Sequence, residues 1–446
     1  MTTITKSDHI FWIKTPVLKM IDYQYFIPIC FAVAFIIRLA YILLIPTTPD
    51  IADSKWYYET AINLASGKGL MYNGKLTAYW PMGYSAFLGA LFWMFGPSIF
   101  IAKLANVILY MGVLLFSYLL SKKLFSSEFI SRTSLFILAL YPNHISYSAE
   151  IMSETLFLFL FMMGAYFLFK SERIGLNLFI SGLVFGFATL VKSQVIFLPG
   201  LLLIFWVAIN SKNTIKTMLP RIIPLLAMLY FSLSLFVLPL TLRNYLVFDK
   251  FVLVSNNGGI NLFLGNSPLA TRAVYGMPIL PNDIQSTYEH DVQVDEYQAD
   301  KKMSKQIVDY IREHPVETLI NLPKKAWYMW YMDVDGGRLN ERNSVTATDS
   351  LRRFFFIFKL VSQAYYLCII SLFFVAMYFL LQSRHNRDAL SLGLLIIVYF
   401  TCISLVFHGQ TRFHFPVMPW IVIYASFAVE KLLHQTNTVV HTSHSG

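Results

Sequence analysis

Residues 25–46 read YFIPICFAVAFIIRLAYILLIP, and this stretch decides the fold. Its single charged side chain is Arg38, and a helix needs only about 20 predominantly apolar residues to cross the hydrocarbon core of a bilayer. A small-residue cleavage site does not follow the stretch, as it would in a secretory signal. We therefore interpret it as a retained first membrane span.

Further apolar blocks follow along the chain, which is 56% hydrophobic and only 13% charged. A soluble domain carries roughly 25% charged residues, so this chain lacks the polar groups to cover a water-facing surface. The segment 84–96 is too short to span and is expected to be an interfacial or re-entrant helix. We predict an all-α polytopic membrane protein of about ten transmembrane helices, at 25–46, 98–121, 129–147, 151–169, 175–191, 194–210, 221–240, 354–381, 389–407 and 415–433.

The net charge of +10 reflects basic residues at the ends of apolar blocks, such as Lys122, Lys123 and Lys431. Cytoplasmic flanks of membrane helices have this pattern, so nucleic acid is not the expected partner. The same rule puts both termini inside. We expect a plasma (inner) membrane protein with two long segments, 47–97 and 241–353, facing the periplasm or exterior.

This orientation divides the chain into regions. Residues 1–240 form an N-terminal transmembrane module that includes the first outer loop, 241–353 a small outer segment between spans 7 and 8, and 354–433 the C-terminal spans. Within the outer segment, 289–321 is predicted to be helical, with a stop at Glu313-His314-Pro315. The glycine-rich stretch 255–268 is expected to form a tight turn that supports a binding wall. The polar tail 434–446 is expected to be disordered.

Two acidic residues, Asp50 and Asp53, follow the first span and are expected at the membrane surface. In a helix beginning near Asp53, Tyr57 lies one turn further on the same face. A carboxylate in this position can act as a general base toward an acceptor hydroxyl. It can equally serve as the N-cap of an interfacial helix, and the two roles are compatible.

Glu150 and Glu154 lie at the start of the fourth predicted span, where the helix dipole favours an acid. An ionisable group inside a span is expensive and therefore a functional candidate. Near the end of a helix it can also reach water, so a purely structural role stays open. 

Lys192, Arg243 and Arg412 are isolated cations that the predicted topology brings to the outer side. Singly, each fits an anchor whose charged end reaches the interface. Together, opposite the carboxylates, they fit an anionic ligand, because Arg grips a phosphate bidentately and Lys acts as a point charge.

Five motifs follow one another along the chain. They are the first-loop pattern of Asp53, Tyr57, Ala61, Leu64, Gly67 and Gly69; YWPMGY (79–84); SETLF (153–157); RNY (243–245) with NGGINLFLGN (257–266); and RF (412–413) with PVMP (416–419). In this order they resemble the motifs of GT-C-type membrane glycosyltransferases of the protein mannosyltransferase and lipid A aminoarabinose transferase (ArnT) kind. The resemblance covers nearly the whole chain. One departure is Lys192, which stands where arginine followed by proline is commoner in the family.

The resemblance implies an inverting glycosyltransferase that moves a sugar from an undecaprenyl- or dolichyl-phosphate carrier to a lipid, polysaccharide or protein acceptor. It implies Asp53 as the catalytic carboxylate. We expect the donor phosphate near Arg243, Lys192 and Arg412. The resemblance leaves metal dependence undecided, so a divalent ion stays a candidate cofactor. The residues expected to support the site or its acceptor side are Tyr57, Tyr79, Tyr84, Glu150, Glu154 and Asn261.

Two other classes of protein stay open at this level. A transporter or flippase of lipid-linked sugars predicts charges near the membrane midplane, whereas here they lie at the outer surface. A structural subunit of a surface-polymer complex would not need carboxylates and cations together.

Overall fold

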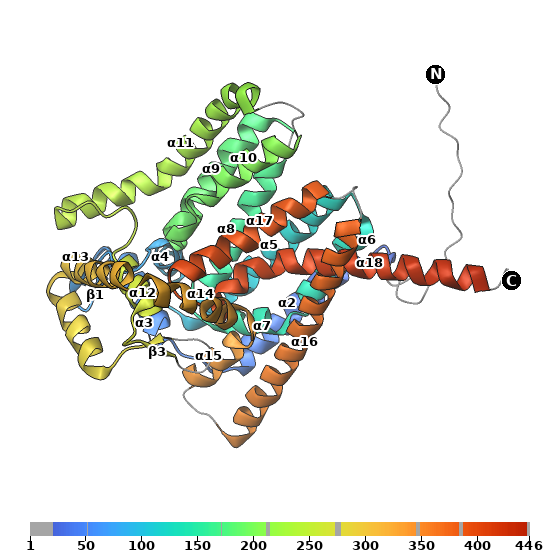
Figure 1. Ribbon diagram of the computed structural model, residues 1–446. Helices are drawn as coiled ribbons and strands as arrows, with labels where there is room; N and C mark the ends of the chain where they lie inside the picture. The colour runs from blue at the N-terminus through green and yellow to red at the C-terminus, as the bar shows by residue number, and fades with distance from the viewer. Residues whose placement is uncertain are drawn as a thin grey trace.

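The computed structural model describes residues 21–443, apart from residues 51 and 171 and the segments 211–214, 273–277, 345–347 and 383–386. Across the described residues the fold is helical, with two short hairpins (Figure 1). The hairpins pair β1 (Met71–Tyr72) with β2 (Lys75–Leu76) and β3 (Thr271–Arg272) with β4 (Pro278–Ile279). The α-helices are α2 (Phe26–Leu44), α3 (Ala52–Ala65), α4 (Gly83–Phe95), α5 (Ile99–Phe125), α6 (Glu128–Ala139), α7 (Pro142–Ser146), α8 (Glu154–Phe169), α9 (Ile174–Val191), α10 (Leu198–Asn210), α11 (Ile215–Phe248), α12 (Gly258–Asn266), α13 (Asn282–Glu313), α14 (Pro315–Trp330), α15 (Asp335–Asn343), α16 (Asp349–Gln382), α17 (Arg387–Val406) and α18 (Met418–Ser443).

Long apolar helices dominate the fold. Among the described residues, six helices are long and apolar enough to cross a membrane, and shorter apolar helices accompany them. The chain is therefore a multi-pass membrane protein. A helix overlaps each of the ten predicted spans, while the number that cross a bilayer stays a prediction.

The third predicted span, 129–147, is not one continuous helix. Its helix α6 ends at Ala139, and the short helix α7 begins at Pro142 after an extended Tyr141. Proline has no N–H to donate, and the residue before it is pushed out of the helical region. The break leaves a short outer turn of α7 and the 3₁₀-helix η1 (Tyr147–Ala149).

Three other segments differ from expectation. Helix α11 continues past residue 240 to Phe248, because LRNYLVF keeps the apolar helical pattern, so Arg243 lies inside a helix. The glycine-rich stretch forms the helix α12 instead of a tight turn. The segment expected to be a disordered tail extends α18 as helix through Ser443, and 444–446 lie outside the described residues.

The predicted stop at Glu313-His314-Pro315 is confirmed. Helix α13 ends at Glu313 and α14 begins at Pro315. The first helical position is where proline fits best, because its missing N–H would have no intrahelical partner there.

The apolar core forms where α5, α8 and α9 pack together, around buried aromatic side chains such as Phe157, Phe161 and Phe185. Helix α4 also packs against the end of α9 at Gly83. A Cβ atom at Gly83 would come within 2.6 Å of the Leu190 backbone, so only glycine permits this approach. 

The first outer loop and the second outer segment pack against each other. The carboxylate of Glu296 accepts hydrogen bonds from the Thr77 hydroxyl at 2.8 Å and the Ala78 backbone N–H at 2.6 Å. The Tyr288 hydroxyl donates a hydrogen bond to the Tyr79 hydroxyl at 3.2 Å. In Figure 1, β1, α3, α12 and α13 lie toward the left of the molecule, and the end of α18 leaves on the right. The two segments predicted to face outward therefore share one side of the molecule.

Candidate active site

Asp53 and Arg412 form an ion pair, although they are 359 residues apart in the sequence. Asp53 lies in the first turn of α3, and Arg412 lies in the 3₁₀-helix η4 (Thr411–Val417) that precedes α18. An Arg412 guanidinium N–H donates to Asp53 Oδ2 at 2.7 Å. Both side chains are about a quarter exposed, at 26% and 24%. The pair is shielded from bulk water yet open to a ligand.

A second ion pair joins Glu154 and Lys192. Lys192 Nζ lies 3.1 Å from Glu154 Oε1, at the point where α9 ends and α8 begins. Glu154 is only 2% exposed, and Lys192 is 18% exposed. A charge buried this deeply is stable only with a partner, and the start of α8 adds the favourable end of the helix dipole.

Both ion pairs face a single cavity of about 530 Å³. This volume lies within the range of about 300–1,000 Å³ that small-molecule sites occupy. The wall combines polar, aromatic and apolar side chains. The polar and aromatic lining includes Asp53, Tyr57, Tyr79, Trp80, Ser153, Glu154, Lys192, Gln194, Asn257, Asn261, His408, Gln410 and Arg412, and the apolar lining includes Ile196, Phe197, Ile260, Leu264, Phe400, Ile403 and Phe407.

Tyr57 and Tyr79 supply phenol groups to this wall. Burial raises the pKa of Tyr57, and the neighbouring carboxylate of Asp53 raises it further. Burial likewise raises the pKa of Tyr79 to about 12, against the hydrogen bond with Tyr288. Both phenols are therefore protonated at neutral pH and can donate to the oxygens of a ligand.

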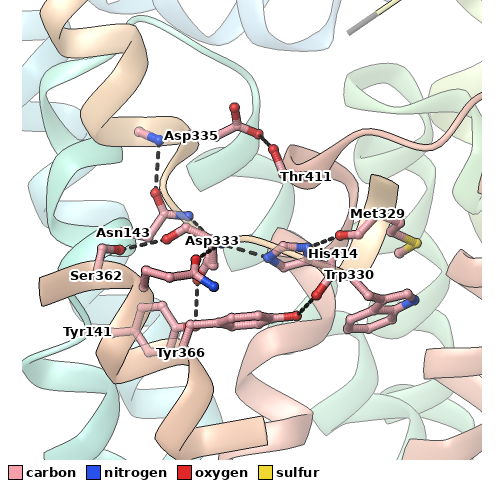
Figure 2. A network of polar contacts seen from close by, with 12 residues as sticks. Tyr141, Asn143, Met329, Trp330, Asp333, Asp335, Ser362, Tyr366, Thr411 and His414 are labelled. Atoms are coloured by element: carbon pink, nitrogen blue, oxygen red, sulfur yellow. Dashed lines mark hydrogen bonds and ion pairs between the residues drawn. The ribbon is translucent and has the colours of Figure 1, made fainter. Parts of the chain in front are cut away.

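A buried polar network binds helix η4 through Thr411 and His414 (Figure 2). The Thr411 hydroxyl donates to a carboxylate oxygen of Asp335. His414 donates from Nδ1 to the Met329 carbonyl at 2.5 Å, and its Nε2 lies 3.1 Å from Asp333 Oδ1.

Residues i and i+3 lie on the same side of a 3₁₀-helix, because each turn has three residues. Thr411 and His414 therefore share the face that is fastened to Asp335 and Asp333. Arg412 emerges on another face, toward Asp53. 

The structure brings most of the predicted site residues to one cavity. Asp53, Tyr57, Tyr79, Glu154, Lys192, Asn261 and Arg412 all line it. Tyr84, Glu150 and Arg243 are not part of its lining.

The three remaining side chains act as structural supports. Tyr84 is fully buried and packs edge-on against Tyr57, with ring centroids 5.2 Å apart. Glu150 accepts hydrogen bonds from Asn340 at 2.5 Å and Asn343 at 2.7 Å. Arg243 donates to the Thr77 carbonyl at 2.9 Å, so its guanidinium braces the first outer loop.

Sequence reasoning missed the network behind η4. Asp333 also accepts a hydrogen bond from the Tyr141 hydroxyl at 2.6 Å, and Asp335 pairs with Arg338 at 3.0 Å. The only signal in the sequence was the pair of acids in Asp333-Val334-Asp335, set among aromatic residues of the outer segment.

Among the described residues, no group of three or more His, Cys, Asp or Glu side chains is arranged to hold a metal ion. The acidic side chains that line the cavity are two carboxylates, and each is paired with one cation. This arrangement suits a ligand that carries negative charge and offers hydroxyl groups.

Comparison with known proteins gives one family match and several similar folds. Residues 80–236, about a third of the chain, match the family described as dolichyl-phosphate-mannose-protein mannosyltransferase. The fold is similar to the oligosaccharyltransferase of Archaeoglobus fulgidus, at 12% identity in each case. For its crystal structure with zinc and sulfate the TM-score is 0.53, and for the one tethered to an acceptor peptide with an NVT sequon it is 0.54.

Each of these matches covers 92% of this chain, which spans about half the length of the archaeal enzyme (50%). The structure of ArnT from Cupriavidus metallidurans bound to undecaprenyl phosphate matches with a TM-score of 0.44 at 12% identity, over 90% of this chain and 76% of that one. No curated protein sequence matches the chain.

The family match covers residues 80–236, and the similarity to the archaeal oligosaccharyltransferase concerns the fold of nearly the whole chain. Both agree with the resemblance to membrane glycosyltransferases that the sequence motifs indicated.

Proposed function

We propose that this protein transfers a sugar from a polyprenyl-phosphate carrier to a hydroxyl group of an acceptor at the outer face of the plasma membrane. The observation that carries the proposal is the convergence of the Asp53–Arg412 and Glu154–Lys192 ion pairs on one cavity. A phosphate-linked sugar needs cations for the phosphate and a carboxylate for the attacking hydroxyl. Both lie on this wall.

Asp53 is the proposed general base. It takes the proton of the acceptor hydroxyl, whose oxygen attacks the anomeric carbon on the face opposite the phosphate. The carbon–oxygen bond to the phosphate breaks, the phosphate keeps the electron pair, and the anomeric configuration inverts. General-base assistance typically accelerates such a step about 10²–10⁴-fold.

Arg412 and Lys192 are the proposed phosphate ligands. A guanidinium carries five N–H donors, so Arg412 can hold Asp53 and a phosphate oxygen at the same time. Lys192 adds a point charge within the same cavity. Fixed cations stabilise the charge that grows on the leaving phosphate more strongly where water is excluded. Arg243 is not among the proposed phosphate ligands, because it is not part of the cavity lining and its guanidinium donates to the Thr77 carbonyl of the first loop.

The apolar wall around Phe197, Phe400 and Phe407 offers a surface for the first isoprene units of the carrier. The basic flanks of the apolar helices favour an orientation with ten spans, both termini inside and the cavity outside. The acceptor is a lipid, polysaccharide or protein hydroxyl.

The decisive test replaces the proposed base. Asp53→Asn should lower the rate of sugar transfer at least about 10²-fold while carrier affinity changes little, because the amide cannot take a proton. The measurements are transfer from a labelled polyprenyl-phosphate sugar in vesicles and binding of the carrier. The matched control is Asp50→Asn, a neighbouring exposed carboxylate.

The control should transfer at the wild-type rate. Wild-type turnover in Asp53→Asn would remove Asp53 as the base. Absence of transfer by the wild-type protein with any polyprenyl-phosphate sugar would remove the proposed function itself.

A further inference from the structure

Helix α14 presents an apolar face to the outside of the molecule. Val316, Leu319, Ile320 and Trp327 are 66%, 63%, 60% and 65% exposed. At 3.6 residues per turn these positions, with the exposed Pro323, fall within an arc of about 100°. Single exposed apolar side chains are ordinary, but a contiguous arc of large ones marks a contact surface.

The opposite face of α14 is fastened to the protein. Lys325 and Met329 are buried there, and Lys325 Nζ donates to Asn266 Oδ1 at 2.7 Å and to the Leu405 carbonyl at 2.8 Å. The backbone at Gly409 touches the same turn, since a Cβ atom there would lie 1.8 Å from the Lys325 carbonyl oxygen. The helix therefore cannot roll to bury its apolar arc.

The C-terminal end of α14 lies beside the middle of the long apolar helix α16. The Tyr366 hydroxyl donates to the Trp330 carbonyl at 2.5 Å, and the Gln363 amide donates to the Tyr331 carbonyl at 3.2 Å. At this level of α16 the outward side chains are apolar and exposed, as at Leu360 (57%) and Leu367 (53%). In a multi-pass membrane protein such side chains face lipid.

We infer that α14 lies in the membrane interface, with its apolar arc inserted among the lipid acyl chains. The end of α14 meets α16 at a level where the exposed side chains of α16 are apolar, and this favours lipid over a soluble partner. Lys324 lies at the edge of the arc and is exposed, so its stem can cross the interface while its ammonium reaches the headgroups.

The bilayer then helps to hold one wall of the cavity in place. The carbonyl of Leu405 and the backbone of Gly409, which α14 contacts, flank the cavity-lining residue His408. This inference concerns the membrane surface and does not depend on the proposed sugar transfer.

The test measures whether the apolar arc of α14 lies in lipid or in water. In a full-length background with Cys368 and Cys402 replaced by alanine, Leu319→Cys and Ile320→Cys each carry a nitroxide label in proteoliposomes. Collision rates with oxygen, which partitions into lipid, and with a water-soluble nickel chelate give the surroundings of each label. Lys301→Cys on exposed α13 is the aqueous control, and Leu242→Cys on α11 is the lipid control.

Labels at 319 and 320 should resemble the label at 242, with oxygen collisions dominant. Accessibility to nickel equal to that at 301 would overturn the inference, because the arc would then face water. Protection from both reagents would overturn it as well, because a protein surface would then cover the arc.

Discussion

Glu154 and Lys192 are charged residues in apolar stretches of the sequence, and such positions indicate a functional or structural partner. Each stands nearly alone among hydrophobic neighbours, and an unpaired charge there would be costly. The structure pairs them at 3.1 Å on the wall of the cavity. The sequence therefore indicated that these residues matter, and the tertiary contact supplied the partner.

Glu150 and Arg243 show the limit of the same reasoning. Both are charged residues near the ends of predicted spans on the expected outer side, just as Lys192 and Arg412 are. Asn340 and Asn343 enclose Glu150, and the carbonyl of Thr77 binds Arg243. A charge satisfied by remote backbone or amide groups looks the same in a sequence as one that faces a ligand.

Glu150 gives a prediction on pH. Burial raises its pKa from 4.5 to about 7, although the hydrogen bonds from Asn340 and Asn343 oppose the shift. The folded protein favours the neutral form of Glu150. The contribution of this protonated carboxyl to the free energy of unfolding is therefore full below pH 4.5 and is lost as the pH rises through about 7. The loss can reach about 3 kcal/mol by about pH 8.

Thermal unfolding midpoints in detergent, measured from pH 4.5 to about pH 8, test this. Glu150→Gln keeps an acceptor oxygen but does not ionise, so the fall in midpoint should become shallower than in the wild type. Parallel curves for the two proteins would show that Glu150 does not titrate in this range.

Among the elements, η4 links the buried network to the cavity. Thr411 and His414 bind the acids Asp335 and Asp333 on one face (Figure 2). Arg412 reaches Asp53 from another face. The network sets the position of the guanidinium. Asp333 and Asp335 are therefore positioning residues for the site.

This role predicts a specific coupling. Thr411→Val removes one hydrogen bond of η4, worth on the order of 1 kcal/mol, and should weaken binding of the polyprenyl-phosphate carrier several-fold. The same change made in an Arg412→Gln background should have no further effect, because it acts only through Arg412. Carrier affinity is the measurement, with thermal midpoints to check folding.

Thr411→Leu is less informative than Thr411→Val, because the extra volume would strain a packed site. An equal loss of affinity in both backgrounds would mean that the network supports the fold generally and not Arg412 in particular.

In the whole molecule, the cavity lies where the two outer segments meet the helices. Glu296 of α13 binds Thr77 and Ala78 of the first loop, so the walls come from parts of the chain far apart in sequence. Burial also raises the pKa of Glu296. All of these contacts lie on the side that the charge pattern assigns to the exterior.

The orientation is tested by labelling single cysteines in cells with a membrane-impermeant maleimide. In the background lacking Cys368 and Cys402, where only the buried Cys30 remains, Lys301→Cys should react in intact cells, because it is exposed on the segment predicted to face outward. Lys123→Cys, at the end of α5, should react only after the membrane is opened. The reverse pattern would place the cavity in the cytoplasm and exclude an outer-face transferase.

The sequence by itself determined the membrane class, the helix in each predicted span, the break before Pro315 and the family resemblance. These follow from local properties: the length of apolar blocks, proline chemistry and ordered motifs. Only the tertiary structure decided which charges share a cavity, that Arg243 braces a loop, and that α6 stops short of a full span. The physical reason is that pairing and burial depend on contacts between residues as distant as Asp53 and Arg412, which local patterns do not encode.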